Sequence, residues 1–444
     1  MGRSELLASC QEAVRNAKRL GADQAEAYAQ MVESVSSTVE KHDLQISKSQ
    51  MGSAIGIRAF IGGRVGFAST NRLDRIEDAC QDAVALARIS PVDPHNVLPE
   101  PAEVPPMDGL FDPAAASFSA ASAVEQATEI LAETERIDPR VIVNDATFDA
   151  TMQDIAIANS SGLAVTERGS LFVYWIVATA RDGERVSSFD FQFGATRRVH
   201  DIDVTVPVHR VCENALSSLD AEPGESFRGT VLLSPAAVSD ILLSALLFQL
   251  NARNALRGRT RWKDSIGAFV ASDAFSLVDD GRLAGGVASS AFDREGVPRR
   301  RLALIEDGRL ASHIHNTYSS HAAGTNNTGH AAGSAQSVPG IGATNLAILP
   351  GERTSNALIA DVSKGLIVQR YSGNVDPISG DFSGVVKAAR LIEGGELGRP
   401  VSGTLISGNA FDVLNRISGV SSNREQIFSQ TLPYVRLEDI SVSA

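Results

Sequence analysis

The sequence predicts an α+β fold in which an N-terminal domain of two α-β-α repeats precedes a β-rich C-terminal domain. Three observations support this prediction. A helical stripe opens the chain and alternating β-like segments follow it, the same order recurs after a proline-rich stretch, and one long helix precedes many short β-like segments divided by glycines. We expect the C-terminal domain to form antiparallel, packed or barrel-like sheets together with that one long helix.

The first repeat begins with a helix over Ser4 to Leu20, where apolar residues recur at helical spacing. We expect Ser4 to be the N-cap and Gly21 to end the helix. Alternation typical of β-strands covers Ala25 to Thr70. Within it, Gly62-Gly63 predicts a tight hairpin turn, because both central residues of such a turn have positive φ.

A second helix is expected from Arg72 to Ile89, and a proline-rich linker follows it. Between Ser90 and Pro113 the chain has seven prolines. Proline lacks the backbone N–H that helices and central strands require, so this stretch is predicted to be extended and to wrap a surface.

The second repeat is expected to run from a helix at Ser117 to Arg136 to a helix at about Val204 to Leu219. Pro223-Gly224 then predicts a boundary between domains at residues 1–222 and 223–444. The strands expected between the two helices are VIVNDATFDAT, QDIAIANS, LAVTERG, LFVYWIVATAR and RVSSFDFQF.

The C-terminal domain is expected to contain one long helix over Ser234 to Leu256, after a strand at Thr230 to Ser234. Glycines then divide the remaining sequence into short β-like segments. These are FVASDAFSLVDDG, RRRLALIEDGRL, NLAILPG, LIVQRYSG, SGTLISG and PYVRLEDISVSA.

Composition limits the classes of function. The chain has 444 residues, 43% of them hydrophobic, and carries a net charge of −13 from 40 basic and 53 acidic residues. This length and hydrophobic share suit large globular domains. Because binding to nucleic acid needs clustered Lys and Arg, the acidic balance argues against a nucleic-acid partner.

The cysteines and the apolar runs indicate a cytoplasmic protein without a membrane segment. Cys10, Cys80 and Cys212 are widely spaced inside helix-like runs, which predicts reduced core residues rather than disulfides. The first residues are amphipathic and lack the apolar core of a signal peptide, and no later run has the length of a membrane span. The sequence also lacks a G-x-S-x-G nucleophile motif and a Walker loop.

The most informative segment is Gly373 to Asn409, which contains GNVDPISGDFSG, IEGGELGRPVSG and TLISGN. Its Gly, Ser and Asn residues suit main-chain binding of an extended peptide, yet it has no good nucleophile and no set of metal ligands. The segment resembles the C-terminal signature of the TldD/PmbA family, in its TldE (PmbA) branch. The resemblance extends through GIRAFIGGRVGFAST, ANSSGL, FDREGVP and the region of Gly308 and Thr317, in the family's order.

The resemblance implies a metallopeptidase fold whose zinc is held by another chain. Members of the TldD branch carry a helix with His-Glu, three further residues and His, and a cysteine ligand in the C-terminal region. The corresponding helix here has no His and no Glu between Ser234 and Leu256, and no cysteine follows Cys212. Zinc needs imidazole, thiolate or carboxylate ligands. The chain therefore resembles the metal-free subunit of a heterodimer, with zinc expected in a TldD-type partner and no cofactor in this chain.

Candidate substrate-binding residues come from two segments, and no catalytic or metal-ligating residue is assigned. The candidates are Tyr318, Ser319, Asn374, Asp381, Phe382 and Ser383. An ordinary surface loop would also explain Tyr318 and Ser319, and a turn beside a buried aromatic residue would explain Asp381 and Phe382.

Two further clusters have both a structural and a functional explanation. His313, His315, His321 and His330 raise the possibility of a metal site of the chain's own, although carboxylate or cysteine partners are missing nearby, and histidines at the surface or in contact with a peptide are the simpler explanation. The basic clusters are expected to be solvated, or else to bind acidic side chains of a partner. They comprise Arg294, Arg299, Arg300 and Arg301, and Arg253, Arg257, Arg259, Arg261 and Lys263.

Three hypotheses follow. The chain is the non-catalytic subunit of a heterodimeric zinc peptidase or amide hydrolase that encloses a peptide or amide substrate. Alternatively, it is a homodimeric protein that binds peptides without cutting them, or an independent hydrolase that uses the histidine cluster.

Overall fold

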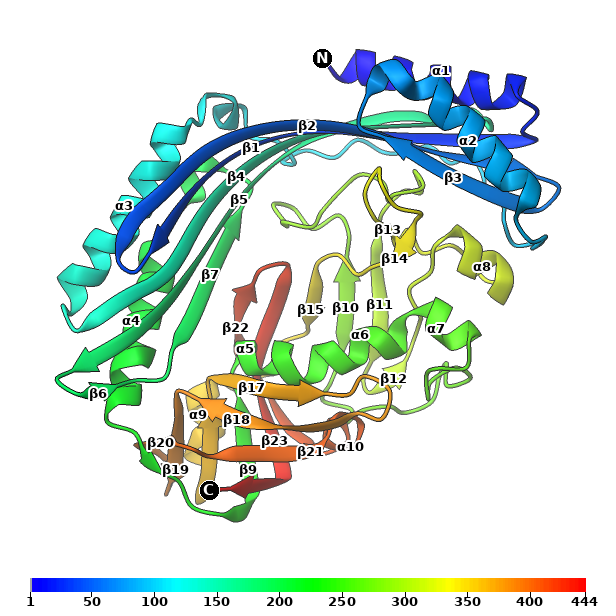
Figure 1. Ribbon diagram of the computed structural model, residues 1–444. Helices are drawn as coiled ribbons and strands as arrows, with labels where there is room; N and C mark the ends of the chain where they lie inside the picture. Colours follow the sequence, from blue (N-terminus) through cyan, green and yellow to red (C-terminus); the bar gives the residue numbers. More distant parts are fainter. Residues whose placement is uncertain (1) are drawn as a thin grey trace.

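The N-terminal half of the chain forms one bent antiparallel sheet, as a computed structural model describing residues 2–444 shows (Figure 1). The strand order is β3-β2-β1-β4-β5-β6, and β7 also pairs with β5. Its strands are β1 (Gln24–Glu40), β2 (Asp43–Ile61), β3 (Arg64–Thr70), β4 (Val141–Asn159), β5 (Ala164–Asp182), β6 (Arg185–Val186) and β7 (Asp190–Thr196).

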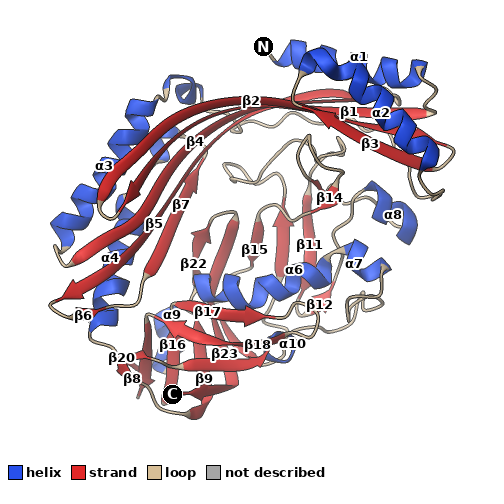
Figure 2. Ribbon diagram, in the orientation of Figure 1, coloured by secondary structure: helices blue, strands red, loops and turns tan. Residues whose placement is uncertain are grey.

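Four helices cover the outer face of this sheet, and the C-terminal half lies on its inner side (Figure 1, Figure 2). The element order is α1-β1-β2-β3-α2 and then α3-β4-β5-β6-β7-α4, with β1 and β4 paired at the junction. The prediction of an α-β-α unit used twice is therefore confirmed. The helices are α1 (Arg3–Arg19), α2 (Ile76–Ile89), α3 (Ala120–Ile137) and α4 (Thr205–Leu219).

The first helix and first hairpin differ only slightly from the prediction. The helix begins at Arg3 with Gly2, rather than Ser4, as its N-cap, and Gly21 follows it with φ +102°. Gly62 and Gly63 have φ of +54° and +75°, as the predicted turn requires. Cys10, Cys80 and Cys212 are free and buried, as expected, and burial raises the pKa of Cys10 to about 12.

The strands of the second repeat were predicted to be shorter than they are. Four of the predicted segments merge into β4 and β5, which have 19 residues each. Gly169, expected near a strand end, lies inside β5, where an added Cβ would lie 3.2 Å from the Arg197 guanidinium and 3.5 Å from the carbonyl oxygen of Leu110. This glycine therefore marks a close approach of other backbone, not a break.

The proline-rich linker is extended, as predicted: no helix or strand occurs between α2 and the 3₁₀ helix Pro113–Ser117. It runs along the inner side of the bent sheet and contacts both halves of the chain. Arg282 of the C-terminal half donates hydrogen bonds to the carbonyl oxygens of Pro105 and Pro106, at 3.3 and 2.8 Å. Its own residues Leu98 and Leu110 are buried.

The C-terminal half forms a 14-stranded sheet and a separate two-stranded sheet, β13 (Ala331–Ala332) with β14 (Gly340–Ile341). Most pairs are antiparallel, as predicted, but β9 with β16, β15 with β23 and β8 with β20 are parallel. The strands of the large sheet are β8 (Glu222–Pro223), β9 (Phe227–Leu233), β10 (Leu277–Asp280), β11 (Arg301–Glu306), β12 (Arg309–Leu310), β15 (Leu346–Ile348), β16 (Lys364–Val368), β17 (Arg370–Val375), β18 (Asp381–Lys387), β19 (Ala389–Glu393), β20 (Glu396–Ser402), β21 (Leu405–Asn409), β22 (Ile417–Ile427) and β23 (Gln430–Ser443).

The long helix predicted for Ser234 to Leu256 is shorter than expected. It runs through α5 (Pro235–Val238), a π-helical turn (Ser239–Leu243) and α6 (Ser244–Leu250). Asn251 then adopts an extended conformation and its side chain accepts a hydrogen bond from the Arg253 N–H, which starts the separate helix α7 (Ala252–Leu256). The remaining helices are α8 (Thr317–Ala323), α9 (Ser355–Ala360) and α10 (Ala410–Leu414), with further 3₁₀ helices at Leu73–Arg75 and Val199–Asp201.

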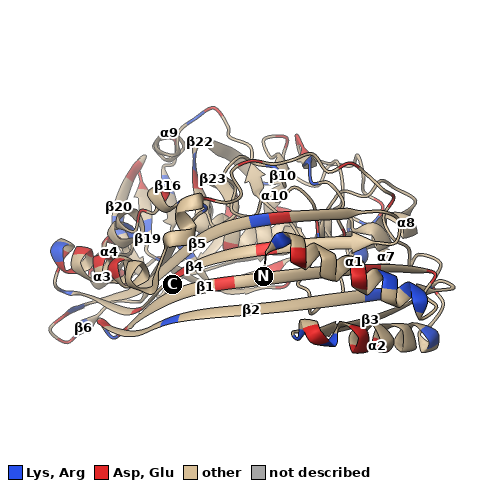
Figure 3. Cartoon of the chain, turned by 90° about the horizontal axis from the view of Figure 1, so that it is seen from above, with Lys and Arg blue, Asp and Glu red and all other residues tan. Residues whose placement is uncertain are grey.

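Charges of both signs occur on the outward helices α1, α2 and α3 (Figure 3). Such mixing gives these helices no continuous basic face of the kind that nucleic acid binding uses. Within residues 2–444, no helix combines the length and the apolar character needed to cross a bilayer.

Candidate functional site

The predicted residues of the Gly373 to Asn409 segment lie on the paired strands β17 and β18. Asn374 lies opposite Ser383, and Asp381 lies opposite Asn409 on β21. Asp381 accepts a hydrogen bond from the Asn409 side-chain amide at 2.8 Å, and this bond, with that from Ser379, lowers the pKa of Asp381. Asn374, Asp381 and Ser383 are exposed.

Phe382 has the opposite environment, because it is only 4% exposed. Its ring packs against Tyr371 in an edge-to-face arrangement with centroids 6.2 Å apart, inside the large core of the C-terminal half. The phenyl group thus contributes to packing under β18, while the polar neighbours on this strand face outward.

Tyr318 and Ser319 lie on the short helix α8, away from those strands. The Ser319 side chain and Asn316 form a reciprocal capping box, and Ser319 is fully buried. The Tyr318 hydroxyl donates to Asp93 of the linker at 2.8 Å. Within residues 2–444, no side-chain hydrogen bond connects either residue with the predicted residues on β17 and β18. The two groups of candidates therefore occupy separate places.

The four clustered histidines separate into three environments. His313 and His315 pack edge to face with ring centroids 6.5 Å apart, and burial, with His313 beside it, lowers the pKa of His315 to about 4. His330 lies 3.5 Å from the carboxylate of Asp279. His321 is hydrogen-bonded to His95 of the linker, Nδ1 to Nδ1, at 2.9 Å. Across the described residues 2–444, no three His, Cys, Asp or Glu side chains form a group that could hold a metal ion.

A buried network of charges joins the two halves of the chain. Glu26 of β1 lies opposite Arg58 of β2 and accepts hydrogen bonds from it at 3.1 and 2.5 Å. Arg294 donates to Glu26 at 3.1 Å, and Arg58 donates to Glu295 at 2.9 Å. Burial lowers the pKa of Arg294, whereas the two glutamates outweigh burial and raise that of Arg58.

Part of the basic cluster at Arg294 is therefore not solvated, contrary to the prediction. The Arg294 side chain is 2% exposed, and its guanidinium also lies 3.9 Å from the centre of the Tyr28 ring. Arg300 and Arg301, in contrast, are exposed as expected. The network continues to α8, because the Thr317 N–H donates to Glu295 at 2.9 Å.

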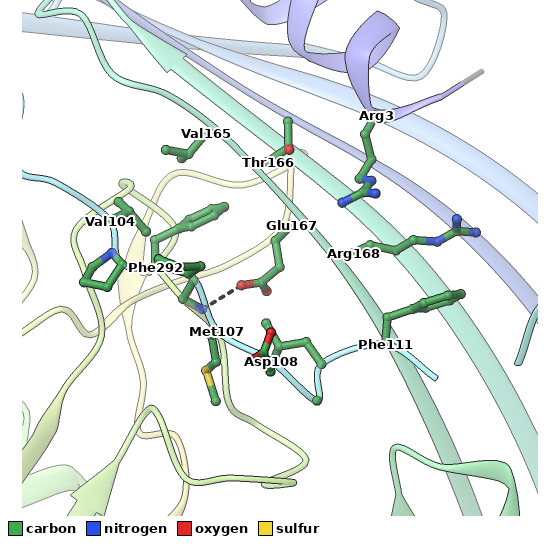
Figure 4. A pocket seen from close by; sticks show the side chains of 15 residues that line it. Arg3, Val104, Met107, Asp108, Phe111, Val165, Thr166, Glu167, Arg168 and Phe292 are labelled. Carbon is green, nitrogen blue, oxygen red and sulfur yellow. Dashed lines mark hydrogen bonds between the residues drawn. The ribbon is translucent and has the colours of Figure 1, made fainter. Parts of the chain in front are cut away.

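Two neighbouring cavities lie between the bent sheet and the C-terminal half. The larger, which we call the linker cavity, has a volume of about 490 Å³ (Figure 4). Figure 4 shows the Glu167 carboxylate directed toward the loop that carries Phe292, where it accepts a hydrogen bond from the Ala291 N–H at 2.6 Å. The linker cavity is lined by Arg3, residues 104–111, residues 165–168, Ala291 and Phe292.

The smaller cavity, which we call the arginine cavity, has a volume of about 250 Å³ and shares Glu167 and Phe292 with the linker cavity. At its edge, Arg197 donates to the carbonyl oxygens of the linker residue Leu110 and of Gly286, Val287 and Ser289, which holds the two halves together. The residues that line the arginine cavity are Tyr28, Gln153, Ile155, Glu167, Gly169, Arg197, Ala288, Ser289, Ser290, Phe292, Asp293, Arg294, Arg299, Ala331, Ala332 and Gly333.

Comparison with known protein families gives three consecutive matches along the chain. Residues 25–87 match the PmbA/TldA metallopeptidase domain 1, residues 117–219 the central domain, and residues 226–444 the C-terminal domain. The chain belongs to the TldD/PmbA family.

Individual members of the TldD/PmbA family are similar over nearly the whole chain. The metalloprotease PmbA of Escherichia coli is 26% identical, over 94% of this chain and 92% of that protein. A metalloprotease TldD homolog of Haemophilus influenzae is 25% identical, over 91% and 86%. The crystal structure of TldE from Thermococcus kodakarensis has the same fold, with a TM-score of 0.89, 22% identity and coverage of 98% of this chain and 100% of that one.

The helix α5–α6 is the helix in which the resemblance to the TldD branch predicts the counterpart of the zinc-binding motif. Its inward side chains are apolar: Ile241, Leu242, Leu243, Leu246 and Leu250 are each at most 1% exposed. The polar side chains of the helix have other partners. Asp240 lies 3.8 Å from Arg370, with its pKa raised by burial, and Gln249 donates to the carbonyl oxygen of Pro377 at 2.8 Å.

Sequence reasoning missed Glu26, Arg58, Glu167 and Arg197. A signal for two of them was present, because Glu26 and Arg58 are single charges inside otherwise apolar β segments, AEAYA and GIRAF. Charged residues are rarely buried unless they are paired, so two such positions on neighbouring strands indicate a buried pair. Glu167 and Arg197 gave no comparable local signal.

Proposed function

We propose that this chain is the zinc-lacking, TldE-type subunit of a two-chain peptidase or amide hydrolase of the TldD/PmbA family. In this proposal a TldD-type partner carries the zinc, and this chain encloses an extended peptide or amide substrate. The supporting observation is the helix α5–α6, whose inner face is apolar and which carries no His, Cys or Glu; its one carboxylate, Asp240, lies beside Arg370. We also propose that the pair acts in the cytoplasm.

The exposed polar residues of β17 and β18 are the proposed contacts with substrate or partner. Asn374, Asp381 and Ser383 present outward side chains beside a buried aromatic residue. Tyr318 is a second proposed contact, because its ring is only partly buried between the linker and Arg253. The buried Ser319 and Phe382 would act by holding these elements in place.

The test is to co-express the chain with a zinc-bearing TldD-type member of the family. We expect a stable complex that contains zinc and cleaves an unfolded peptide, while the chain alone contains no zinc and cleaves nothing. Replacing Ser383 by Arg should weaken the complex or its activity, whereas Ser47→Arg, on an exposed part of β2, should change neither. Failure of every TldD-type partner to bind or to gain activity would refute the subunit role.

The homodimeric peptide-binding hypothesis remains the alternative, favoured by the two cavities that the chain forms by itself. Light scattering of the purified chain, with and without an unfolded peptide, distinguishes it. A homodimer that binds peptide and ignores every TldD-type partner would support the alternative. Zinc bound to the chain alone would instead direct attention to the histidines near α8.

A further inference from the structure

The arginine cavity contains hydrogen-bond donors that the protein does not use. Arg299 donates from Nη1 to the carbonyl oxygen of Gly329 at 2.8 Å. Within residues 2–444, its Nε is buried without a partner, and neither Nε nor Nη2 takes part in a hydrogen bond or an ion pair. The Nε and Nη2 edge of a guanidinium is the planar fork that binds a carboxylate through two parallel hydrogen bonds.

Other donors line the same space. The Tyr28 hydroxyl has no hydrogen-bond partner among the described residues, although the residue is only 5% exposed, and burial raises its pKa to about 12. The phenol therefore stays protonated and can donate. Nη2 of Arg294 is also buried without a partner, beside the bonds that Nε and Nη1 make to Ser334 and Glu26.

Neither acidic residue of the cavity forms a hydrogen bond or an ion pair with Arg299 within residues 2–444, although the charge of Arg299 acts to lower the pKa of both. Glu167 already accepts hydrogen bonds from the Ser290 hydroxyl and the Ala291 N–H. Asp293 accepts from three backbone N–H groups, those of Glu295, Val297 and Ala331. Both carboxylates thus already accept hydrogen bonds from this chain, that of Glu167 on β5 from residues 290–291 and that of Asp293 mainly from its own loop. The unused hydrogen-bonding groups of Arg299, Arg294 and Tyr28 are all donors, which favours an acceptor with negative charge.

We propose that the arginine cavity binds a carboxylate group, held by the Nε and Nη2 edge of Arg299 and by the Tyr28 hydroxyl. The C-terminal carboxylate of a short peptide fits this space best. The linker cavity adjoins it at Glu167 and Phe292, and its apolar residues Val104, Met107 and Val165 could receive the preceding side chains of the peptide. A free small carboxylic acid shares the same chemistry.

The proposal is tested by isothermal titration calorimetry on the purified chain alone. The probes are an N-acetylated Ala-Ala-Leu peptide with a free C-terminal acid, the same peptide as its C-terminal amide, acetate and inorganic phosphate. The variants are Arg299→Gln, Tyr28→Phe and, as a matched control, Arg300→Gln. Arg300 neighbours Arg299 in sequence but is exposed and donates to the Asn327 carbonyl oxygen at 2.8 Å.

We expect the peptide acid to bind at least about tenfold more tightly than the amide, a difference of about 1.4 kcal/mol. Arg299→Gln should lose this preference, and Tyr28→Phe should weaken acid binding about fivefold, as expected for one hydrogen bond. Arg300→Gln should bind like the parent. If acetate binds as tightly as the peptide acid, with the same dependence on Arg299, the carboxylate site stands and its ligand is a small acid.

Equal binding of acid and amide, binding of phosphate alone, or no heat from the peptide acid at about millimolar concentration would overturn the proposal. An unchanged affinity in folded Arg299→Gln would overturn it as well. If that variant does not fold, Tyr28→Phe and the comparison of acid with amide decide the question. Because the assay measures binding to the isolated chain, its failure is distinct from failure of the subunit role, which is measured as hydrolysis by the pair.

Discussion

Replacing Glu26 by Gln should destabilise the protein strongly, because this carboxylate balances two buried arginines. Glu26 is 1% exposed and accepts three hydrogen bonds, two from Arg58 and one from Arg294. The variant leaves both guanidinium groups buried with Glu295 as the one remaining carboxylate in this network. Breaking a buried ion pair by removing one partner costs about 3 to 5 kcal/mol, and we expect a loss of that size in the free energy of unfolding.

The assay is urea unfolding followed by tryptophan fluorescence, which reports on both halves of the chain because Trp175 lies on β5 and Trp262 in the C-terminal half. Glu40→Gln is the matched control, since Glu40 is exposed at the end of the same strand, and its change should stay within about 0.5 kcal/mol. A loss below about 1 kcal/mol for Glu26→Gln would refute the reasoning. The double variant Glu26→Gln, Arg294→Met should lose less than the sum of the two single variants, because it removes the surplus positive charge.

Two further variants test other features. Burial holds His315 neutral, so its contribution to stability is complete above its ordinary pKa of 6.5 and is lost as the pH falls toward about 4. Between pH 7 and pH 4, the free energy of unfolding should therefore fall by about 3 kcal/mol less in His315→Gln than in the parent. An equal fall in both proteins would contradict the assignment. Gly66→Ala should lower the free energy of unfolding by about 1 to 3 kcal/mol, because the added Cβ would lie 2.0 Å from the carbonyl oxygen of Ala83. Gly52→Ala is the control and should not destabilise the protein, because no atom lies within 4 Å of its added Cβ. Equal thermal midpoints for the two variants would count against this packing argument.

Local signals in the sequence were sufficient for the helices α1 to α4, the first hairpin and the linker, but not for the interruption of the helix after Ser234 or for the short helices α8 to α10. The Gly62-Gly63 turn and the prolines after Ile89 act through backbone conformation that depends on neighbouring residues alone, so they could be read directly. The full length of β4 and β5 could not, because both strands are continued by pairing with distant strands across residues that look like breaks, such as Gly169.

The candidate site shows the same division between local and distant information. The burial of Phe382 depends on neighbours in space that the sequence does not specify, whereas the capping role of Ser319 is local, because its partner Asn316 lies three residues earlier. In the sequence, Arg294 and Arg299 look like members of one solvated cluster. In the structure they line a cavity together with residues of the N-terminal half such as Tyr28, Glu167 and Arg197. What decides whether a charge is solvated or paired is the partner that folding brings to it, such as Glu26 for Arg294.

The ionic network between the halves restricts how this molecule can move. A hinge motion that opened the arginine cavity by swinging the bent sheet away would have to separate Glu26 from Arg294 and Arg58 from Glu295, exposing four charges at once. The guanidinium of Arg197 donates to carbonyl oxygens of three segments, the linker at Leu110, β5 at Ser170 and residues 286–289, and it opposes the same motion. We therefore expect the chain to behave as a rigid frame. Entry of a ligand would have to rely on small movements of the linker and the loops, not on domain opening.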